Sequence, residues 1–144
     1  APVRGHERFG ERLRQWAERE FGAALLWLPE GPDPERAYAR MQVFVHLPDV
    51  DEGLGRTAIE AQASGVPVVA WPRGGLGETF LDGVTGRAVP IGDTAAAADA
   101  IVALLADPQT RLGMARAARR RAAAVFSRER CARAVEQVYE ELLR

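Results

Sequence analysis

The sequence has no lysine, no asparagine, a single cysteine and almost no net charge. Because Cys131 is alone, no disulfide can form within the chain, which fits a reducing compartment. A formal net charge of -1 gives no reason to expect nucleic acid or an acidic membrane surface as a partner. Without lysine, arginine must supply the solvated helix faces. The arginines at residues 119–121 therefore predict such a face and not a phosphate site.

Long apolar runs are also absent. None approaches the roughly 20 residues that a membrane-spanning helix needs. The first residues do not resemble a signal peptide, because residues 4–8 are polar and no long apolar core follows. We therefore expect a cytoplasmic protein. Peripheral attachment to a membrane, through a domain outside this chain, is left open.

The chain does contain short apolar runs that alternate with helical patterns. Continuous apolar runs are typical of strands covered on both faces, and apolar residues at helical spacing are typical of amphipathic helices. We expect strands at residues 23–28, 43–47, 66–71 and 87–89. We expect helices at residues 6–20, 34–41, 56–64, 94–105 and 111–125, a helical turn at 78–81, and a last helix capped by Ser127. The 144 residues thus predict one partial α/β domain, a Rossmann-like parallel sheet flanked by helices, with C-terminal helices over residues 92–144.

One glycine-flanked turn carries most of the candidate chemistry. Glu52 precedes the turn, and Glu60 lies about one turn into the helix that follows. Gly55, Arg56 and Thr57 expose backbone amides at the start of that helix. Helical side chains lean toward the N-terminus, so both carboxylates and these amides can reach one small volume. Such a set suits a ribose diol, a diphosphate and a sugar, although either carboxylate alone would be explained by solvent exposure or the helix dipole.

Several motifs follow one another around this turn at regular spacing. Residues 52–69 follow E-G-x-G-x-x-x-x-E-A-x-A-x-G-x-P-V-V, residues 74–78 follow G-G-x-x-E, and residues 82–86 follow D-G-x-x-G. This series resembles the signature of glycosyltransferase family 4, the retaining enzymes of GT-B fold. The resemblance covers roughly residues 35–144, with the motifs in order.

The resemblance implies a role for each part of the turn. It implies that Glu60 binds the ribose hydroxyls of a nucleotide-diphosphate sugar. It implies that Glu52, the catalytic candidate, lies by the donor sugar. The amides of Gly53, Leu54 and Gly55 would contact the sugar and the phosphates. The resemblance thus implies a nucleotide-sugar donor, with no metal or other cofactor required.

Other positions of the signature are also donor-binding candidates. Gly74 and Gly75 would let the backbone approach the donor closely, because glycine has no Cβ. Arg56 could set its charge against phosphate, although Arg56 and Thr57 fill positions that vary in the family. His46 is expected to be a strand histidine with satisfied hydrogen bonds and not a catalytic base.

The resemblance also implies that part of the protein is missing. Family members have two Rossmann-like domains and over twice this length, so an absent N-terminal domain should hold the acceptor. Two interpretations of the first residues remain open. Either Arg4 follows the first strand of the domain and contacts the diphosphate, or residues 6–20 form the second helix and Arg4 has no role.

Both interpretations lack the central first strand of a sheet with the order 3-2-1-4-5-6. The expected strands at residues 23–28 and 43–47 would then pair directly, receive a strand from another chain, or belong to a fragment. An unfilled gap would leave strand edges open, which predicts self-association or strand swapping.

The sequence favours the donor-binding part of a glycosyltransferase, inactive by itself, that moves a sugar from a nucleotide diphosphate to an acceptor. The alternative is a non-catalytic nucleotide-binding or assembly module, because this chain alone lacks an acceptor domain. An unrelated Rossmann-like nucleotidyltransferase or epimerase domain fits less well, since no G-x-G-x-x-G follows a first strand.

Overall fold

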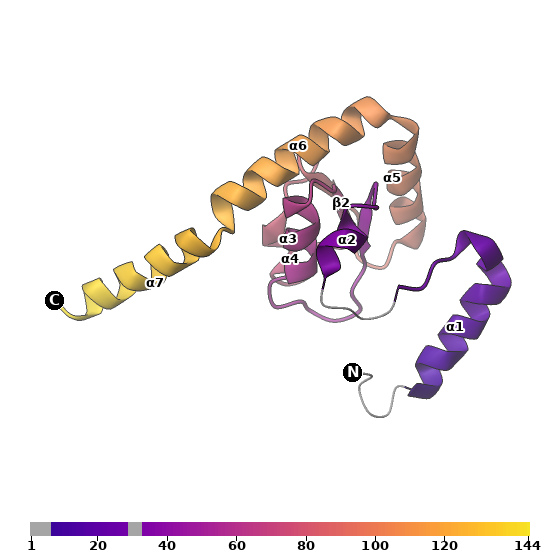
Figure 1. The fold of residues 1–144 in the computed structure, drawn as a ribbon, viewed down its shortest axis with the longest axis horizontal. Coiled ribbons are helices and arrows are strands. Elements are labelled where there is room, and N and C mark those ends of the chain that lie inside the picture. The colour runs from indigo at the N-terminus through magenta and orange to yellow at the C-terminus, as the bar shows by residue number, and fades with distance from the viewer. Residues whose placement is uncertain (1–6, 29–32) are drawn as a thin grey trace. The chain divides into compact units, whose positions relative to one another are not determined.

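The computed structural model describes residues 7–28 and 33–144, so Arg4 lies outside the described residues. The chain divides into two units, Ala1–Pro32 and Asp33–Arg144 (Figure 1). The division into one partial domain with C-terminal helices stays a prediction. No helix of the described residues is both long and apolar enough to cross a membrane.

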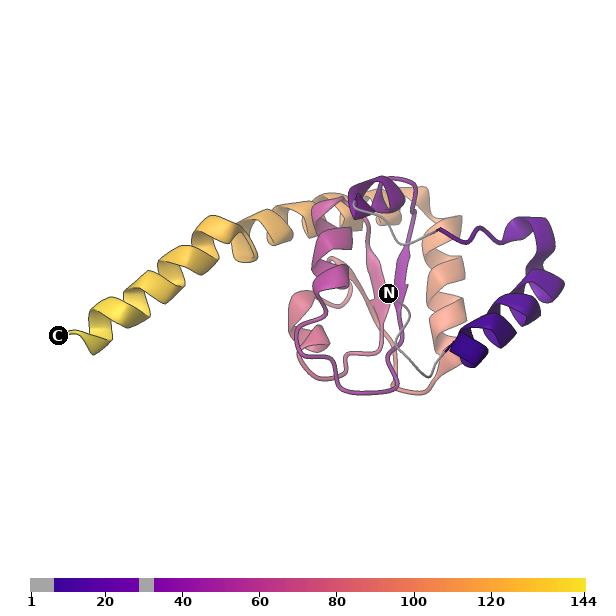
Figure 2. The ribbon, with the colours of Figure 1, turned by 60° about the horizontal axis from the view of Figure 1, so that its bottom comes forward.

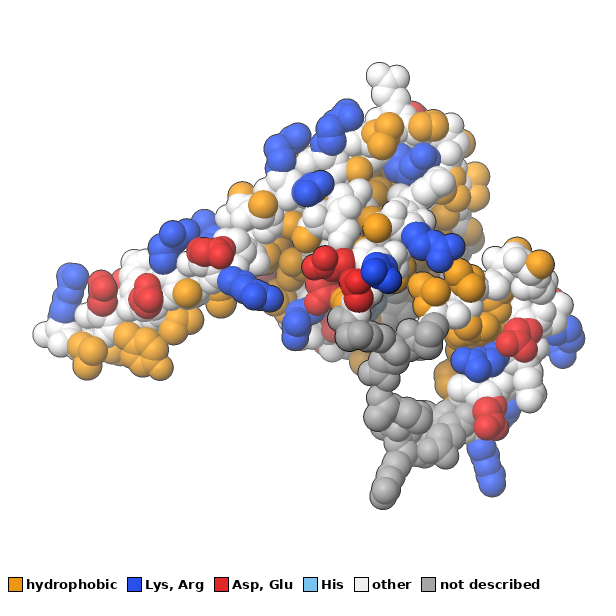
Figure 3. All heavy atoms as spheres, viewed as in Figure 1, with side chains coloured by type: hydrophobic (Ala, Val, Ile, Leu, Met, Phe, Trp, Pro, Cys, Tyr) orange, Lys and Arg blue, Asp and Glu red, His pale blue; other side chains and the backbone are white. Residues whose placement is uncertain are grey.

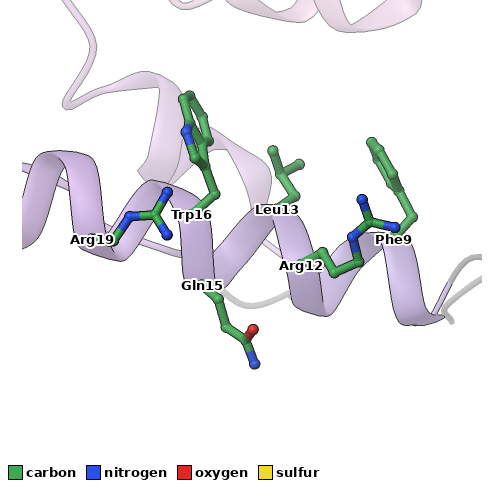
Figure 4. Close-up of a pocket in the computed structure, with 6 residues that line it drawn as sticks. All are labelled: Phe9, Arg12, Leu13, Gln15, Trp16 and Arg19. Atoms are coloured by element: carbon green, nitrogen blue, oxygen red, sulfur yellow. The ribbon is translucent and has the colours of Figure 1, made fainter.

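The first unit contains one long helix, α1 (Glu7–Phe21), which confirms the expected helix. Phe9, Leu13 and Trp16 project from the same side of this helix and line a hollow of about 490 Å³ (Figure 4). Their spacing of four and three residues is that of one helical face. All three side chains are at least 40% exposed, and Ala17 is buried.

The expected strand at residues 23–28 is wrong. A short 3-10 helix, η1 (Gly22–Ala24), begins there, and the chain from Leu25 to Leu28 is irregular. Leu26 is 62% exposed, and Trp27 lies 5.2 Å from the Arg14 guanidinium. A strand needs hydrogen bonds to a neighbouring strand. None of the described residues pairs with this run, so its apolar composition alone does not make it a strand.

The second unit is built on a three-stranded parallel sheet in the order β1-β2-β3. The strands are β1 (Phe44–His46), β2 (Val68–Ala70) and β3 (Gly86–Ala88). They lie within the expected strands at residues 43–47 and 66–71 and overlap the one at 87–89. The prediction of an α/β fold with a parallel sheet is confirmed. Among the described residues β1 pairs only with β2, so direct pairing with residues 23–28 is not observed.

Helices cover both faces of this sheet. They are α2 (Pro34–Tyr38), α3 (Arg56–Ala63), α4 (Leu76–Thr79), α5 (Thr94–Ala106) and α6 (Pro108–Val125). The last helix, α7 (Arg128–Leu142), follows α6 and has no buried side chain. Figure 2 shows α3 and α4 on one face and α5 on the other. Alternate residues of β2 explain this arrangement, since side chains of a strand point to opposite faces. Val68 and Ala70 pack with α3 and α4, whereas Val69 packs with α5 and α6.

The helix boundaries follow from capping residues. Asp93 accepts a hydrogen bond from the Ala96 amide, and Ser127 accepts one from the Arg130 amide. Asp107 accepts from the amides of Gln109 and Thr110, and the Thr110 hydroxyl and amide hold the pKa of Asp107 below its ordinary value. These caps confirm the helical C-terminal third. α4 begins two residues before the expected helical turn.

One expectation for the C-terminal helices needs correction. Arg119 and Arg120 of α6 are exposed, as expected, but Arg121 is half-buried and its Nη2 donates to the Glu78 carbonyl oxygen at 2.9 Å. No side chain of α7 is buried. Figure 3 shows apolar side chains along one side of α7 and charged side chains along the other.

Candidate functional site

Two loops meet where β1 and β2 end. Glu52 in the first loop and Gly74 in the second form an isolated parallel bridge, and the Gly75 amide donates to the Glu52 carbonyl oxygen at 2.9 Å. Ligands of open α/β sheets bind beyond the carboxyl ends of the strands. The structure thus brings the two predicted loop segments together at that end of the sheet.

Gly74 and Gly75 allow the two loops to approach each other. Gly74 has a positive φ of 58°. A Cβ at Gly74 would overlap the carbonyl oxygen of Glu52, and a Cβ at Gly75 would overlap the carbonyl oxygen of Gly53. The observed reason for these glycines is therefore contact between the loops.

The helix α3 begins immediately after the first loop. Gly55 precedes it in the left-handed conformation, with φ 67° and ψ 51°. Gly55 has no side chain to cap the helix, and the Ala58 amide donates to the Gly55 carbonyl oxygen at 2.9 Å, which leaves the Arg56 and Thr57 amides without a side-chain cap from Gly55. A Cβ on Gly55 would come within 2.6 Å of Leu76 Cδ1. This start of α3 offers backbone donors to an anion.

Glu60 is held by two side chains. Its Oε2 accepts a hydrogen bond from the Tyr38 hydroxyl at 3.1 Å, and its Oε1 lies 3.7 Å from Arg56 Nη2. Tyr38 is only 6% exposed. Burial, and then the hydrogen bond to Glu60, raise the pKa of Tyr38 to about 12. The Tyr38 hydroxyl therefore remains a hydrogen-bond donor at neutral pH.

Glu52 has a different set of partners. Its Oε1 lies 3.0 Å from His46 Nε2, and the other ring nitrogen of His46 lies 3.2 Å from the Thr57 hydroxyl. His46 is the last residue of β1, and both of its ring nitrogens have partners, as expected. Sequence reasoning missed that these partners are themselves candidate site residues. The contact could not be read from spacing, because it depends on how the loop folds back over β1.

Both carboxylates are linked to the start of α3. Glu60 contacts Arg56, the first residue of the helix, and Glu52 reaches Thr57, the second residue, through His46. No hydrogen bond between the two carboxylates and no shared partner is found among the described residues. Glu60 and Glu52 thus have separate partners, and each is linked to a side chain in the first turn of α3.

A cavity of about 530 Å³ opens beside Glu60. Tyr38 and Glu35 of α2 line one part of it, and Arg119 and Arg128 line another. The arginines bring positive charge toward the Glu60 carboxylate, so the cavity can accept a ligand with both hydroxyl and anionic groups.

The remaining candidates are more exposed. Leu54 is 46% exposed, and the Arg56 side chain is 84% exposed. Arg73, which sequence reasoning did not select, pairs with Asp51 at 2.9 Å and ties the second loop to the first. Within residues 7–28 and 33–144, no group of three or more His, Cys, Asp or Glu side chains is arranged to hold a metal ion.

Sequence comparison finds relatives with named activities. Residues 5–121 match the family described as glycosyl transferases group 1. The chain is 38% identical over 119 residues to a lipopolysaccharide core biosynthesis mannosyltransferase, LpcC, of Rhizobium leguminosarum, covering 83% of this chain and 34% of that protein. It is 42% identical over 107 residues to a D-inositol 3-phosphate glycosyltransferase of Pseudarthrobacter chlorophenolicus, covering 74% of this chain and 26% of that protein.

Solved structures with the same fold extend this comparison. The sucrose-phosphate synthase of Thermosynechococcus elongatus matches with a TM-score of 0.87 and 31% identity, over 99% of this chain and 36% of that chain. The Anabaena protein HepE in complex with UDP matches with a TM-score of 0.90 over 96% of this chain and 38% of that chain. At 24% identity, the second match shows a shared fold.

The chain spans about a third of the length of these proteins. The match to the family covers most of the chain, including both loops and α3. The similarity predicted from the motifs is confirmed, and the chain belongs to the glycosyl transferases group 1 family.

Proposed function

We propose that this chain is the donor-binding part of a retaining glycosyltransferase of GT-B fold. It binds a nucleotide-diphosphate sugar, and a domain outside the chain holds the acceptor. The observation that carries the proposal is the pair of carboxylates, Glu52 and Glu60, each linked by side-chain contacts to the uncapped start of α3. Carboxylates accept from sugar and ribose hydroxyls, and the amides donate to phosphate.

Each carboxylate takes a distinct part of the donor in this proposal. Glu60 accepts hydrogen bonds from the ribose hydroxyls, which is supported by its position at the edge of the cavity beside α2. Glu52 acts at the donor sugar and is the catalytic candidate. Its side chain is 35% exposed, so a sugar can reach it.

The phosphates lie between these two carboxylates in the proposal. The amides of Gly53, Leu54 and Gly55 donate to them, and the exposed Arg56 adds positive charge. Gly74 and Gly75 keep the second loop close to this turn. Because amides and arginine can neutralise the diphosphate, we propose that no metal ion is needed.

Thr57 and Arg4 are the two remaining donor-binding candidates. Thr57 supports His46 through its hydroxyl, so we propose that it reaches the donor only through its backbone amide. Arg4 is retained as a candidate diphosphate contact, although it lies outside the described residues.

The proposal predicts binding of a nucleoside diphosphate by the chain. The chain is titrated with UDP, GDP and ADP, and with their glucose or mannose esters, and binding is followed by calorimetry or by amide chemical shifts. We expect one nucleotide to bind with a dissociation constant in the micromolar to millimolar range. We expect EDTA to leave that binding unchanged. Absence of binding for all three nucleotides would contradict the proposal.

The ligands of the similar solved structures support UDP as the first nucleotide to test. The HepE structures hold UDP, UDP with glucose, or UDP-glucose. Because one relative is a mannosyltransferase, the mannose esters of the other nucleotides are tested as well.

The second candidate function is a non-catalytic nucleotide-binding or assembly module. The two are separated by measuring sugar release from the bound donor. Nucleotide binding without sugar release or transfer in the intact protein favours the module.

We also propose that the chain self-associates. Among the described residues β1 pairs only on its β2 side, and an open strand edge can pair with another chain. We expect the weight-average mass from sedimentation equilibrium to rise with protein concentration. A monomeric mass at every concentration would contradict this proposal.

A further inference from the structure

Three aromatic side chains form a continuous row beside the candidate site. The rings of Tyr38 and Phe44 lie 5.9 Å apart at an interplanar angle of 70°. The rings of Phe44 and His46 lie 6.0 Å apart at 71°. Both contacts are edge-to-face, the arrangement that aromatic pairs favour. The row runs from α2 along one face of β1.

The two ends of this row hold the two carboxylates. The Tyr38 hydroxyl donates to Glu60 Oε2 at 3.1 Å, and His46 Nε2 lies 3.0 Å from Glu52 Oε1. Phe44 stands between the two rings and touches both. A single row of packed rings therefore separates the two hydrogen bonds that orient Glu60 and Glu52.

The contacts of His46 favour one tautomer of a neutral ring. An ionised carboxylate only accepts, so that tautomer carries its proton on Nε2. Its Nδ1 atom then accepts from the Thr57 hydroxyl, which lies 3.2 Å away. The histidine is thus fixed on both sides, by the first loop and by α3.

The row is anchored in the core. Tyr38 is 6% exposed and packs in one cluster with Ala61 and Val66. Phe44 packs against that cluster and against the one under α3 and α4. Phe44 and His46 are two residues apart, so both side chains leave the same face of β1. Side chains locked by such packing can hold a site in its working geometry.

We propose that Tyr38, Phe44 and His46 are positioning residues that set the orientation and separation of Glu60 and Glu52. Tyr38 serves the nucleoside side of the donor, and His46 serves the sugar side. This inference rests on the proposed function, because it takes Glu60 to bind ribose and Glu52 to act at the sugar.

Two shape-conserving substitutions test the two ends. Tyr38→Phe removes only the hydroxyl, and His46→Phe keeps a ring without nitrogens. We expect Tyr38→Phe to weaken the binding of UDP and UDP-glucose by the same factor, roughly 3- to 20-fold. This is less than the loss of a direct hydrogen bond to a charged group, because Tyr38 acts on the donor through Glu60. We expect His46→Phe to change the affinity for UDP by no more than about twofold. The same variant should lower the ratio of the UDP-glucose affinity to the UDP affinity at least threefold.

Substitution of Phe44 tests whether the middle ring of the row supports both carboxylates. Phe44→Leu should weaken the binding of UDP and also lower the ratio of the UDP-glucose affinity to the UDP affinity. The reason is that Tyr38 and His46, which hold the two carboxylates, both lose the ring that packs between them. Phe126→Leu is the matched control, since Phe126 is half-buried and its ring contacts Arg121 of α6. It should change neither affinity.

A spectroscopic readout checks the His46 end without any ligand. Nitrogen-15 spectra of the imidazole rings, with His6→Gln to leave one histidine, should show the Nε2–H tautomer for His46. Thr57→Val should shift the Nδ1 resonance, because that nitrogen loses its donor. A neutral ring with its proton on Nδ1 and none on Nε2 would overturn the His46 half of the proposal.

The binding pattern decides the rest. If His46→Phe weakens the binding of UDP and UDP-glucose by the same factor, or if neither variant changes either affinity, the division of roles is wrong. If wild-type protein binds UDP and UDP-glucose equally, Glu52 makes no useful sugar contact and the sugar-side role of His46 fails. If wild-type protein binds no nucleotide at all, the proposed function fails, and the tautomer experiment still tests the geometry of the row.

Discussion

Replacement of Glu60 by alanine is expected to weaken the binding of UDP by roughly 10- to 100-fold. Hydrogen bonds to a charged group contribute about 1.5–3 kcal/mol, and a tenfold change in affinity corresponds to about 1.4 kcal/mol. The loss falls on the nucleoside part, so UDP and UDP-glucose should weaken by the same factor. Calorimetric titration of both ligands measures the effect.

The same substitution removes the partner of a buried hydroxyl. Tyr38 would lose the acceptor of its hydrogen bond, so some of the effect on affinity could come from a shift of α2. Glu60→Gln separates the two causes, because its amide oxygen can still accept from Tyr38 while the negative charge is lost. A carboxylate on exposed α7 provides the control: Glu136→Ala should change neither stability nor affinity.

Glu52 should behave differently from Glu60. Glu52→Ala is expected to leave UDP affinity within about threefold, since Glu52 faces the sugar in the proposal. In the intact enzyme we expect turnover to fall by roughly 10²-fold or more, as for removal of one preorganised group at a reacting centre. Unchanged affinity and turnover in both glutamate variants would contradict the assignment of the site.

Local signals were sufficient to predict most of the second unit. The proline at the start of α6, the aspartates that cap α5 and α6, and Ser127 before α7 all act within a few residues of where they stand. The same holds for Gly55, whose left-handed conformation begins α3. Short-range chemistry of this kind is visible in one sequence.

The wrong strand prediction at residues 23–28 has a different cause. The run is apolar enough for a strand, but a strand depends on a partner elsewhere in the protein. None of the described residues pairs with it. An apolar pattern shows what the residues can bury and does not identify the neighbour that would bury them.

The support of the site was also hidden from the sequence. Glu52 and Glu60 could be selected from a motif, but their partners His46 and Tyr38 stand 6 and 22 residues away. Nothing in local spacing links Tyr38 to Glu60. The contact arises because α2 and α3 lie on the same side of β1, which is a property of the assembled sheet.

Gly75→Ala is expected to damage both stability and donor binding. Gly75 has ordinary helical dihedral angles, φ -64° and ψ -14°, so alanine is allowed by the backbone itself. The obstacle is contact, because a Cβ would overlap the Gly53 carbonyl oxygen and come within 3.3 Å of Leu54 Cα. Overpacking of this kind typically costs about 1–3 kcal/mol.

The new methyl group must move the first loop away from the second. That movement would break the hydrogen bond from the Gly75 amide to the Glu52 carbonyl oxygen and displace the amides of Gly53 and Leu54. We therefore expect the free energy of unfolding in urea to fall by about 1–3 kcal/mol. UDP affinity should fall more than tenfold, because the displaced amides are those proposed to bind phosphate.

Gly113→Ala is the matched control for this experiment. Gly113 lies inside α6, and a Cβ there would meet no atom within 4 Å. Alanine in a helix interior is favoured over glycine by roughly 0.5–1 kcal/mol, so this variant should be more stable and bind UDP normally. If Gly75→Ala instead matched the wild-type protein in both measurements, the close approach of the two loops would not be needed. The donor site would then depend on α3 and its two carboxylates alone.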